Sequence, residues 1–190
     1  MSDIIKKNFS DHLVVINKVL TSDASTIKLL GELLANCLEK NGTIFWCGNG
    51  GSASDSQHLA AELVGRFRND RRALKSIALT TDTSILTSVG NDYGFDQIFS
   101  RQLQALGSPG DILIGISTSG NSRNILNAFK VASDLGITSI ALTGKDGGIA
   151  NKISDYSIIV NSESTARIQE AHILIGHILC EIIEEQLQFV

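Results

Sequence analysis

Residues 43–63 read TIFWCGNGGSASDSQHLAAEL, and this stretch decides the fold. Its first five residues, 43–47, form a short apolar run, which is typical of a strand buried on both faces of a parallel sheet. A loop of glycine, asparagine and serine follows, and residues 52–66 then have helical periodicity. The stretch therefore predicts one strand, loop and helix unit of an α/β domain.

The same alternation continues to the end of the chain. Further strands are predicted at 76–79, 111–116, 138–142 and 156–160, and further helices at 83–90, 96–106, 122–135 and 165–185. Alternating strands and helices indicate a three-layer α/β/α sandwich around a central five-stranded parallel sheet. With 190 residues, the chain is expected to form a single domain over 1–190.

A helical extension of about residues 1–40 precedes the first strand. It reads as two N-terminal helices broken near Thr21, Ser22 and Asp23, whose side chains can cap a helix start. Both predicted helices have wide apolar faces. These faces either pack within the chain or contact another subunit, and the sequence leaves both alternatives open.

Composition and charge exclude several classes of partner. The formal net charge of -4 gives no basic field, so neither nucleic acid nor a membrane is an expected partner. The three cysteines have no CxxC spacing, and no apolar signal or membrane-spanning run is apparent. A reduced, cytoplasmic protein is therefore expected. Any anionic substrate has to be bound by local groups.

Two loops follow predicted strands and open predicted helices, which is where ligands bind in open parallel sheets. The first loop, 48–56, reads GNGGSASDS, and the second, 117–122, reads STSGNS. Their backbone N–H groups, hydroxyls and helix dipoles can hold a phosphate without a lysine. The alternative is a pair of plain capping loops. The density of hydroxyl residues favours phosphate binding.

The first loop also matches the dinucleotide-binding pattern GxGxxG/A through Gly48, Gly50 and Ala53. That pattern needs an acidic residue about 20 positions further on, at the end of the next strand. Asp82 ends the next predicted strand but lies too far along the chain. Nucleotide binding is therefore not favoured.

Polar side chains on two predicted helices can support chemistry. His58 and Glu62 are four residues apart on one helical face, so they can share a metal or a substrate proton. Gln169, His172 and His177 lie among apolar residues of the last helix, where each polar group needs a specific partner. A histidine satisfied within the core is the alternative.

Two polar segments carry no functional prediction by themselves. The residues 91–94, Asn-Asp-Tyr-Gly, predict a turn. A solvated basic face is predicted for Arg66, Arg68, Arg71 and Arg72.

Five segments together resemble the phosphoheptose isomerases, which are sugar-isomerase (SIS) domain enzymes. They are CGNGGSASDSQHLAAEL at 47–63, VGNDYGFDQIFSRQ at 89–102, GISTSGNS at 115–122, ALTGKDGG at 141–148 and ARIQEAHILIGHILCEII at 166–183. The resemblance implies an SIS fold and a homotetramer, with zinc bound in many members. It also implies conversion of D-sedoheptulose 7-phosphate to D-glycero-D-manno-heptose 7-phosphate through an enediol, in ADP-heptose and lipopolysaccharide core biosynthesis.

The resemblance further implies which residues form the site. Its metal ligands fall on His58, Glu62, Gln169 and His177, and its catalytic acid and base fall on Glu62 and His177. Its substrate-binding positions fall on Asn49, Gly50, Gly51, Glu62, Asn91, Asp92, Ser117, Thr118, Ser119, Ser122 and Gln169.

The chemistry of isomerisation fits these residue types. A proton moves between C1 and C2, so we expect Glu62 to act as the base and His177 as the opposing acid. Zinc would polarise the oxygens as a Lewis acid. Gln169 and His177 lie eight residues apart, about 12 Å along a helix. We therefore expect each active site to be completed across a subunit interface.

Two other classes of SIS protein compete with this interpretation. One associates with the bacterial replication initiator as a tetrameric binding module and does not keep the catalytic pair, whereas Glu62 and His177 are both present here. The other senses a sugar phosphate and regulates transcription, which requires a DNA-binding segment. This sequence has no basic helix that could serve as one.

Overall fold

The computed structural model describes residues 2–188 and contains one sheet of five parallel strands in the order β2-β1-β3-β4-β5. The strands are β1 (Ile44–Gly48), β2 (Ser76–Ala78), β3 (Ile112–Ser117), β4 (Thr138–Gly144) and β5 (Tyr156–Val160). Every residue of β1 and β3 is buried, as their continuous apolar sequences predict. The predicted α/β fold with a five-stranded parallel sheet is confirmed.

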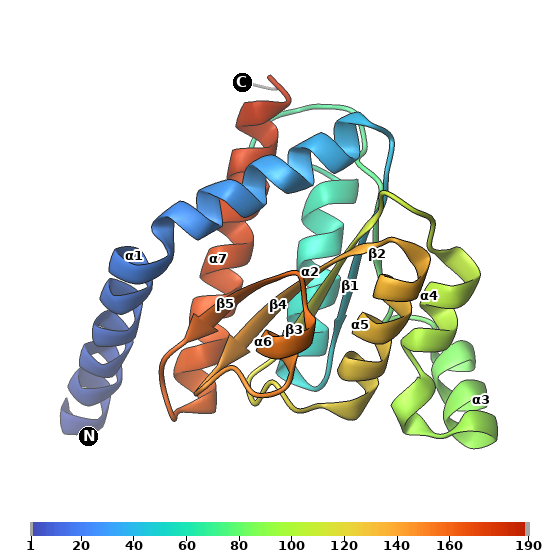
Figure 1. Cartoon of the computed structure of the whole chain (residues 1–190). Helices are drawn as coiled ribbons and strands as arrows, with labels where there is room; N and C mark the ends of the chain where they lie inside the picture. The colour runs from blue at the N-terminus through green and yellow to red at the C-terminus, as the bar shows by residue number, and fades with distance from the viewer. Residues whose placement is uncertain (1, 189–190) are drawn as a thin grey trace.

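Helices cover both faces of this sheet (Figure 1). They are α1 (Ser2–Glu39), α2 (Gly51–Val64), α3 (Thr83–Tyr93), α4 (Ser100–Leu106), α5 (Arg123–Leu135), α6 (Ala150–Ile153) and α7 (Thr165–Gln186), with a short 3-10 helix at Phe95–Gln97. Alternate residues of β1 enter different cores: Trp46 packs with α1, α2 and α7, whereas Phe45 packs with α4 and α5. The chain is thus a three-layer sandwich.

The N-terminal extension is one helix, α1, so the prediction of two helices is wrong. The Thr21 hydroxyl donates to the carbonyls of Asn17 and Lys18 at 3.0 and 2.9 Å, and the Ser22 hydroxyl donates to Lys18 at 2.8 Å. These hydroxyls therefore bond back into the preceding turn instead of capping a new helix. Such back-bonding often bends a helix, and Figure 1 shows α1 changing direction part-way along.

The predicted turn at 91–94 is also wrong, because Asn91 and Asp92 lie in the last turn of α3. The Asp82 carboxylate accepts from the Ile85 N–H at 2.9 Å and caps the start of this helix. Gly94, at φ 91°, ends it. The backbone then forms the 3-10 helix and α4 in place of the single helix predicted at 96–106.

The two polar loops leave the sheet at the same edge, since β1 and β3 are parallel neighbours with Gly48 paired to Ile116. Helices α2 and α7 start beyond this edge and run side by side on one face of the sheet. Within residues 2–188, no helix combines the length and apolarity that a membrane span requires.

Candidate active site

The first polar loop joins β1 to α2 through Gly48, Asn49 and Gly50. A Cβ at Gly48 would lie 2.5 Å from the Ser52 carbonyl oxygen, so only glycine allows α2 to start so close to the strand. No side chain caps the start of α2. Its N-terminal backbone groups can therefore contribute to binding an anion.

The second polar loop, 117–122, lies beside the first and has a similar construction. The hydroxyls of Ser117 and Ser122 are 3.2 Å apart, and the Gly120 N–H donates to the Ser117 hydroxyl at 3.1 Å. Thr118 and Ser119 are partly exposed. The hydroxyls of this loop and the uncapped start of α5 thus lie close together, which is the arrangement expected of a phosphate site.

A reciprocal amide pair joins the two loops. Asn49 and Asn124 each donate from Nδ2 to the other's Oδ1, at 3.0 and 2.8 Å. Asn124 is only 2% exposed, and its Oδ1 also accepts from the Ile125 N–H at 3.0 Å. Asn124 was not among the predicted site residues, although an asparagine on the buried face of an amphipathic helix indicates a buried hydrogen-bond partner.

Three side chains from α2 and α7 form the second part of the site. The ligand atoms of His58, Glu62 and His177 all lie within 4.8 Å of one another. The Nε2 atoms of His58 and His177 are 2.9 Å apart, and His58 Nε2 lies 3.3 Å from a Glu62 carboxylate oxygen. Helical spacing places His58 and Glu62 on one face of α2, as predicted, and α7 supplies His177 opposite them.

Two nitrogens and a carboxylate oxygen at this separation fit a metal ion. Imidazole and carboxylate are ordinary zinc ligands, with bonds of about 2.0–2.2 Å. Gln169, the fourth residue named from the resemblance, is on α7, and its side chain lies against Gly51 at the start of α2, where a Cβ would be 2.6 Å from its Nε2 atom. His58 and Glu62 are two and three turns further along α2, so the side chain of Gln169 lies apart from the other three residues.

Asn91 and Asp92 are exposed at the end of α3, where Asn91 Nδ2 donates to the Asp92 carboxylate at 2.8 Å. A cavity of about 170 Å³ lies between the first loop and the segment that follows α3. Its lining consists of Gly48, Asn49, Gly50, Ala53, Thr80, Leu86, Phe95, Ile98 and Phe99. The sequence carried no signal for its apolar wall.

Comparison with known proteins decides the family. The SIS domain model matches residues 9–144. The phosphoheptose isomerase of Campylobacter jejuni is 52% identical over 97% of this chain and 99% of its own length. The solved phosphoheptose isomerases of Neisseria gonorrhoeae and Francisella tularensis superpose with TM-scores of 0.92 and 0.93, at 43% and 40% identity. They cover 97% and 96% of this chain, and 98% and 97% of their own chains are matched.

The chain belongs to the phosphoheptose isomerase family of SIS-domain proteins. It is therefore a sugar-phosphate isomerase, which excludes the binding-module and regulator alternatives as its main role. The alignment with the Campylobacter jejuni phosphoheptose isomerase includes both polar loops of this phosphoheptose isomerase family member and the three residues of its α2–α7 cluster.

Burial shifts the pKa values of two ionisable groups on the site helices of this phosphoheptose isomerase family member, His172 on α7 and Asp55 on α2. His172 is fully buried, its Nε2 lies 2.9 Å from the Thr143 carbonyl oxygen, and burial lowers its pKa to about 4. It is therefore a neutral core residue, the alternative considered for a histidine on this helix. Burial raises the pKa of Asp55, although His58 opposes the shift, and one Asp55 oxygen is buried without a partner.

The prediction of a solvated basic face at residues 66–72 is wrong for Arg71. Its side chain is fully buried and forms a 2.8 Å ion pair with Glu184, which is also buried. Arg66, Arg68 and Arg72 are exposed, as predicted. The contact of Arg71 could not be predicted from the sequence, because its partner lies more than one hundred residues away.

Proposed function

We propose that the chain converts D-sedoheptulose 7-phosphate to D-glycero-D-manno-heptose 7-phosphate, which supplies heptose for ADP-heptose and lipopolysaccharide core synthesis. One observation carries the proposal: Glu62 and His177 face one another between α2 and α7, and two hydroxyl-rich loops open α2 and α5, in a chain 52% identical to a phosphoheptose isomerase. The loops would bind the phosphate of the substrate, and Glu62 and His177 would transfer protons at its C1 and C2 positions.

The phosphate end of the substrate would bind the loop 117–122. Ser117, Thr118, Ser119 and Ser122 supply hydroxyl donors, and α5 directs the positive end of its dipole towards them. Asn49, Gly50 and Gly51 would bind the sugar from the neighbouring loop, with Asn91 and Asp92 at its rim. This neutral set of donors suits a chain of net charge -4, since no lysine or arginine is needed.

The reacting end of the substrate would lie against Glu62 and His177. The Glu62 carboxylate takes a proton from C1 of the ketose, and His177 donates a proton to the oxygen at C2, which gives the enediol. Returning a proton to C2 and removing the one on the C1 oxygen gives the aldose. His58 faces His177, with their Nε2 atoms 2.9 Å apart, so it can help to orient the His177 ring.

We propose zinc as the cofactor, held by His58, Glu62 and His177 with Gln169 as the fourth ligand. The donor chemistry of the first three residues supports this set. When bound, zinc would polarise the hydroxyl and carbonyl oxygens at C1 and C2. Because Gln169 lies against Gly51, its role as a ligand is easiest to reconcile with a site that a second subunit completes.

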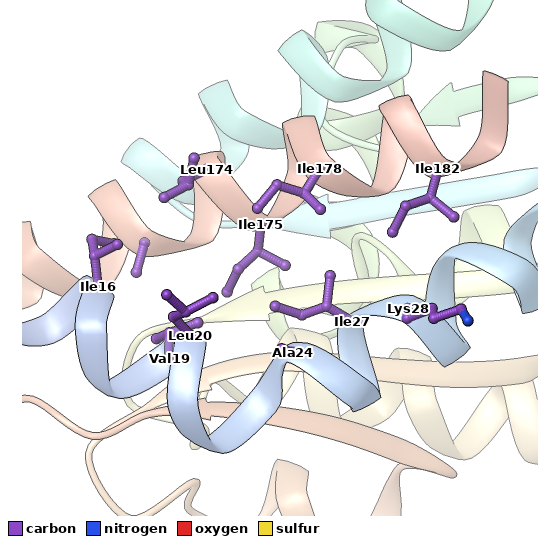
Figure 2. A pocket seen from close by; sticks show the side chains of 11 residues that line it. Ile16, Val19, Leu20, Ala24, Ile27, Lys28, Leu174, Ile175, Ile178 and Ile182 are labelled. Carbon is purple, nitrogen blue, oxygen red and sulfur yellow. The ribbon is translucent and has the colours of Figure 1, made fainter. Parts of the chain in front are cut away.

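We also propose a homotetramer with active sites at subunit interfaces. Helices α1 and α7 enclose an apolar groove of about 250 Å³ (Figure 2), and Leu20 and Leu174 at its edge are 64% and 37% exposed. Exposed apolar residues continue along α1 at Ile4, Ile5, Phe9, Leu13 and Val14. Burial of this surface against a second copy would remove it from water. All three cysteines are unpaired and buried, which supports a cytoplasmic location.

The test is incubation with sedoheptulose 7-phosphate, with a chelator and with added zinc, followed by detection of the aldoheptose phosphate. We expect turnover that falls with the chelator and returns with zinc. Glu62→Gln keeps the size of the side chain but removes the base, so turnover should fall by at least about 100-fold while substrate still binds. Absence of product from the wild-type chain under every condition would contradict the proposed function.

A further inference from the structure

A buried network links the ends of the two helices that carry the proposed acid and base. The Glu184 carboxylate on α7 accepts from the backbone N–H groups of Phe67, Arg68 and Asn69 at 3.0–3.1 Å. It also accepts from Arg71 Nε at 2.8 Å. A single carboxylate therefore fixes most of the loop that follows α2.

The partner of Glu184 holds the end of α2. Arg71 donates from Nη2 to the Glu62 carbonyl at 2.8 Å, and from Nη1 to the Leu63 carbonyl at 2.9 Å and the Gly65 carbonyl at 3.3 Å. These carbonyls belong to the last turn of α2 and the residue after it, where helical partners are lacking and a cation is favourable. The backbone of the proposed base is thus bonded directly to Arg71.

The loop between these contacts carries an aromatic ring onto the proposed acid. The Phe67 ring stacks on the His177 imidazole, with the centroids 5.4 Å apart and the planes at 26°. His177 and Glu184 are seven residues apart, two helical turns, and so lie on one face of α7. Phe67 spans this interval, since its N–H binds Glu184 and its ring covers His177.

The charge state of the network agrees with its geometry. Burial alone would raise the pKa of Glu184, but the three backbone N–H groups and the Arg71 guanidinium outweigh it and lower the pKa. Glu184 is 2% exposed, so it remains an ionised group inside the protein. Removing either partner would leave the other charge buried without compensation.

We propose that Arg71 and Glu184 are positioning residues for the isomerisation, and that they act through Phe67, which holds His177 against His58 and Glu62. The hydrogen bonds of the two charged groups go to the end of α2, to the loop that follows it and to one another. Their effect is to fix the separation of Glu62 and His177 and the ring orientation of His177. This inference rests on the proposed function of Glu62 and His177.

The decisive variant is Phe67→Leu, because it removes the stacked ring and leaves the buried ion pair in place. We expect kcat to fall by about 10- to 100-fold, with KM and the unfolding midpoint close to wild type. Phe67→Tyr keeps the ring and should restore kcat. Zinc affinity, measured by competition with a chelating dye, should fall by about 10-fold in Phe67→Leu, because His177 is then less well oriented.

Glu184→Gln tests the ion pair, and Glu181→Gln is its matched control. Glu181 pairs with Arg68 of the same loop at 2.6 Å, but both side chains are about half-exposed, and no backbone N–H of the loop donates to Glu181 in the described structure. Glu184→Gln should lower kcat and zinc affinity, whereas Glu181→Gln should lower neither. If Glu184→Gln does not fold, the Phe67 variants still decide the question.

Wild-type values of kcat and zinc affinity in Phe67→Leu would overturn the positioning role. The zinc measurement separates the two proposals, because it does not require turnover. A wild-type chain that binds zinc but does not isomerise sedoheptulose 7-phosphate would contradict the proposed function. The effect of Phe67→Leu on its zinc affinity would still confirm or refute the orientation of His177.

Discussion

The two histidines of α7, His172 and His177, differ because of what surrounds each ring. His172 is fully buried, whereas His177 is partly exposed and faces His58 and Glu62. His172 Nδ1 is buried without a hydrogen-bond partner, and its Nε2 faces a backbone carbonyl oxygen. A proton added to this ring would place a charge in the core, so the native protein keeps His172 neutral.

The depressed pKa of His172 predicts a loss of stability in mild acid. The unfolded chain protonates this histidine near pH 6.5, whereas the native chain does so only near pH 4. Between these two values the unfolded state binds more protons than the native state, so the free energy of unfolding decreases as the pH falls from 6.5 to 4. Below pH 4 both states are protonated and the decrease stops. Its size is about 3 kcal/mol. Denaturant unfolding of the wild type at fixed protein concentration, at several values of pH, measures it.

The variant His172→Gln should lose much of this pH dependence. Glutamine can still donate to the Thr143 carbonyl but does not titrate, so its unfolding free energy should fall less between pH 6.5 and pH 4. The variant will be less stable than wild type near pH 7, because the shape of the ring is lost from a packed site. Equal slopes for the two proteins across this range would show that His172 is not the titrating group.

At the scale of elements, the sequence predicts every strand within two residues at either end, because continuous apolar runs between glycine-rich loops have few other interpretations. The errors in the helix predictions occur where polar residues are compatible with two different local structures. Thr21 and Ser22 can cap a helix or bond back into one, and Asn91 and Asp92 can form a turn or end a helix. Only the surrounding packing decides between these alternatives.

The candidate site divides in a similar way. His58 and Glu62 are predictable as neighbours because helical spacing alone brings them together. Asn124 reaches Asn49 across 75 positions of sequence, and Glu184 reaches Arg71 across 113. Such contacts depend on strand order and on how α2 and α7 pack, and no local pattern specifies either. The groups that position the site are therefore the ones that sequence reasoning missed.

The contact between the second polar loop and the β4–α6 connection gives a prediction at this scale. Gly120 has φ 63°, and a Cβ there would lie 2.0 Å from the Gly147 carbonyl oxygen. The left-handed conformation alone costs alanine about 1–2 kcal/mol, and the clash with backbone adds to it. Gly120→Ala should therefore lower stability by more than about 2 kcal/mol and raise KM, since the phosphate loop has to move.

Gly136→Ala is the control for this prediction. Gly136 has a similar φ of 68°, but a Cβ there would meet nothing closer than the Pro109 side chain at 3.7 Å. It should show the conformational cost of about 1–2 kcal/mol with KM unchanged. Denaturant unfolding and steady-state kinetics compare the two variants. Equal effects on both quantities would mean that the contact with Gly147 does not shape the phosphate loop.

At the scale of the whole molecule, polar and apolar surfaces lie in different places. The polar loops lie at the carboxyl edge of the sheet, and the cluster of His58, Glu62 and His177 lies between α2 and α7, two to three turns along α2 from that edge. The exposed apolar residues are concentrated on α1 and along its groove with α7. Because α7 belongs to both surfaces, a subunit that packs on the groove would lie close to the site.

This arrangement predicts that assembly and activity are lost together. Leu20 is 64% exposed at the groove, so Leu20→Glu leaves the monomer core intact but places a charge in the proposed interface. We expect sedimentation velocity to show species smaller than a tetramer, with a loss of kcat of at least about 10-fold because each site lacks its neighbour. Leu106→Glu, at an exposed leucine on α4, should change neither. A fully active monomer of Leu20→Glu would refute the shared site, and an intact tetramer would place the interface elsewhere.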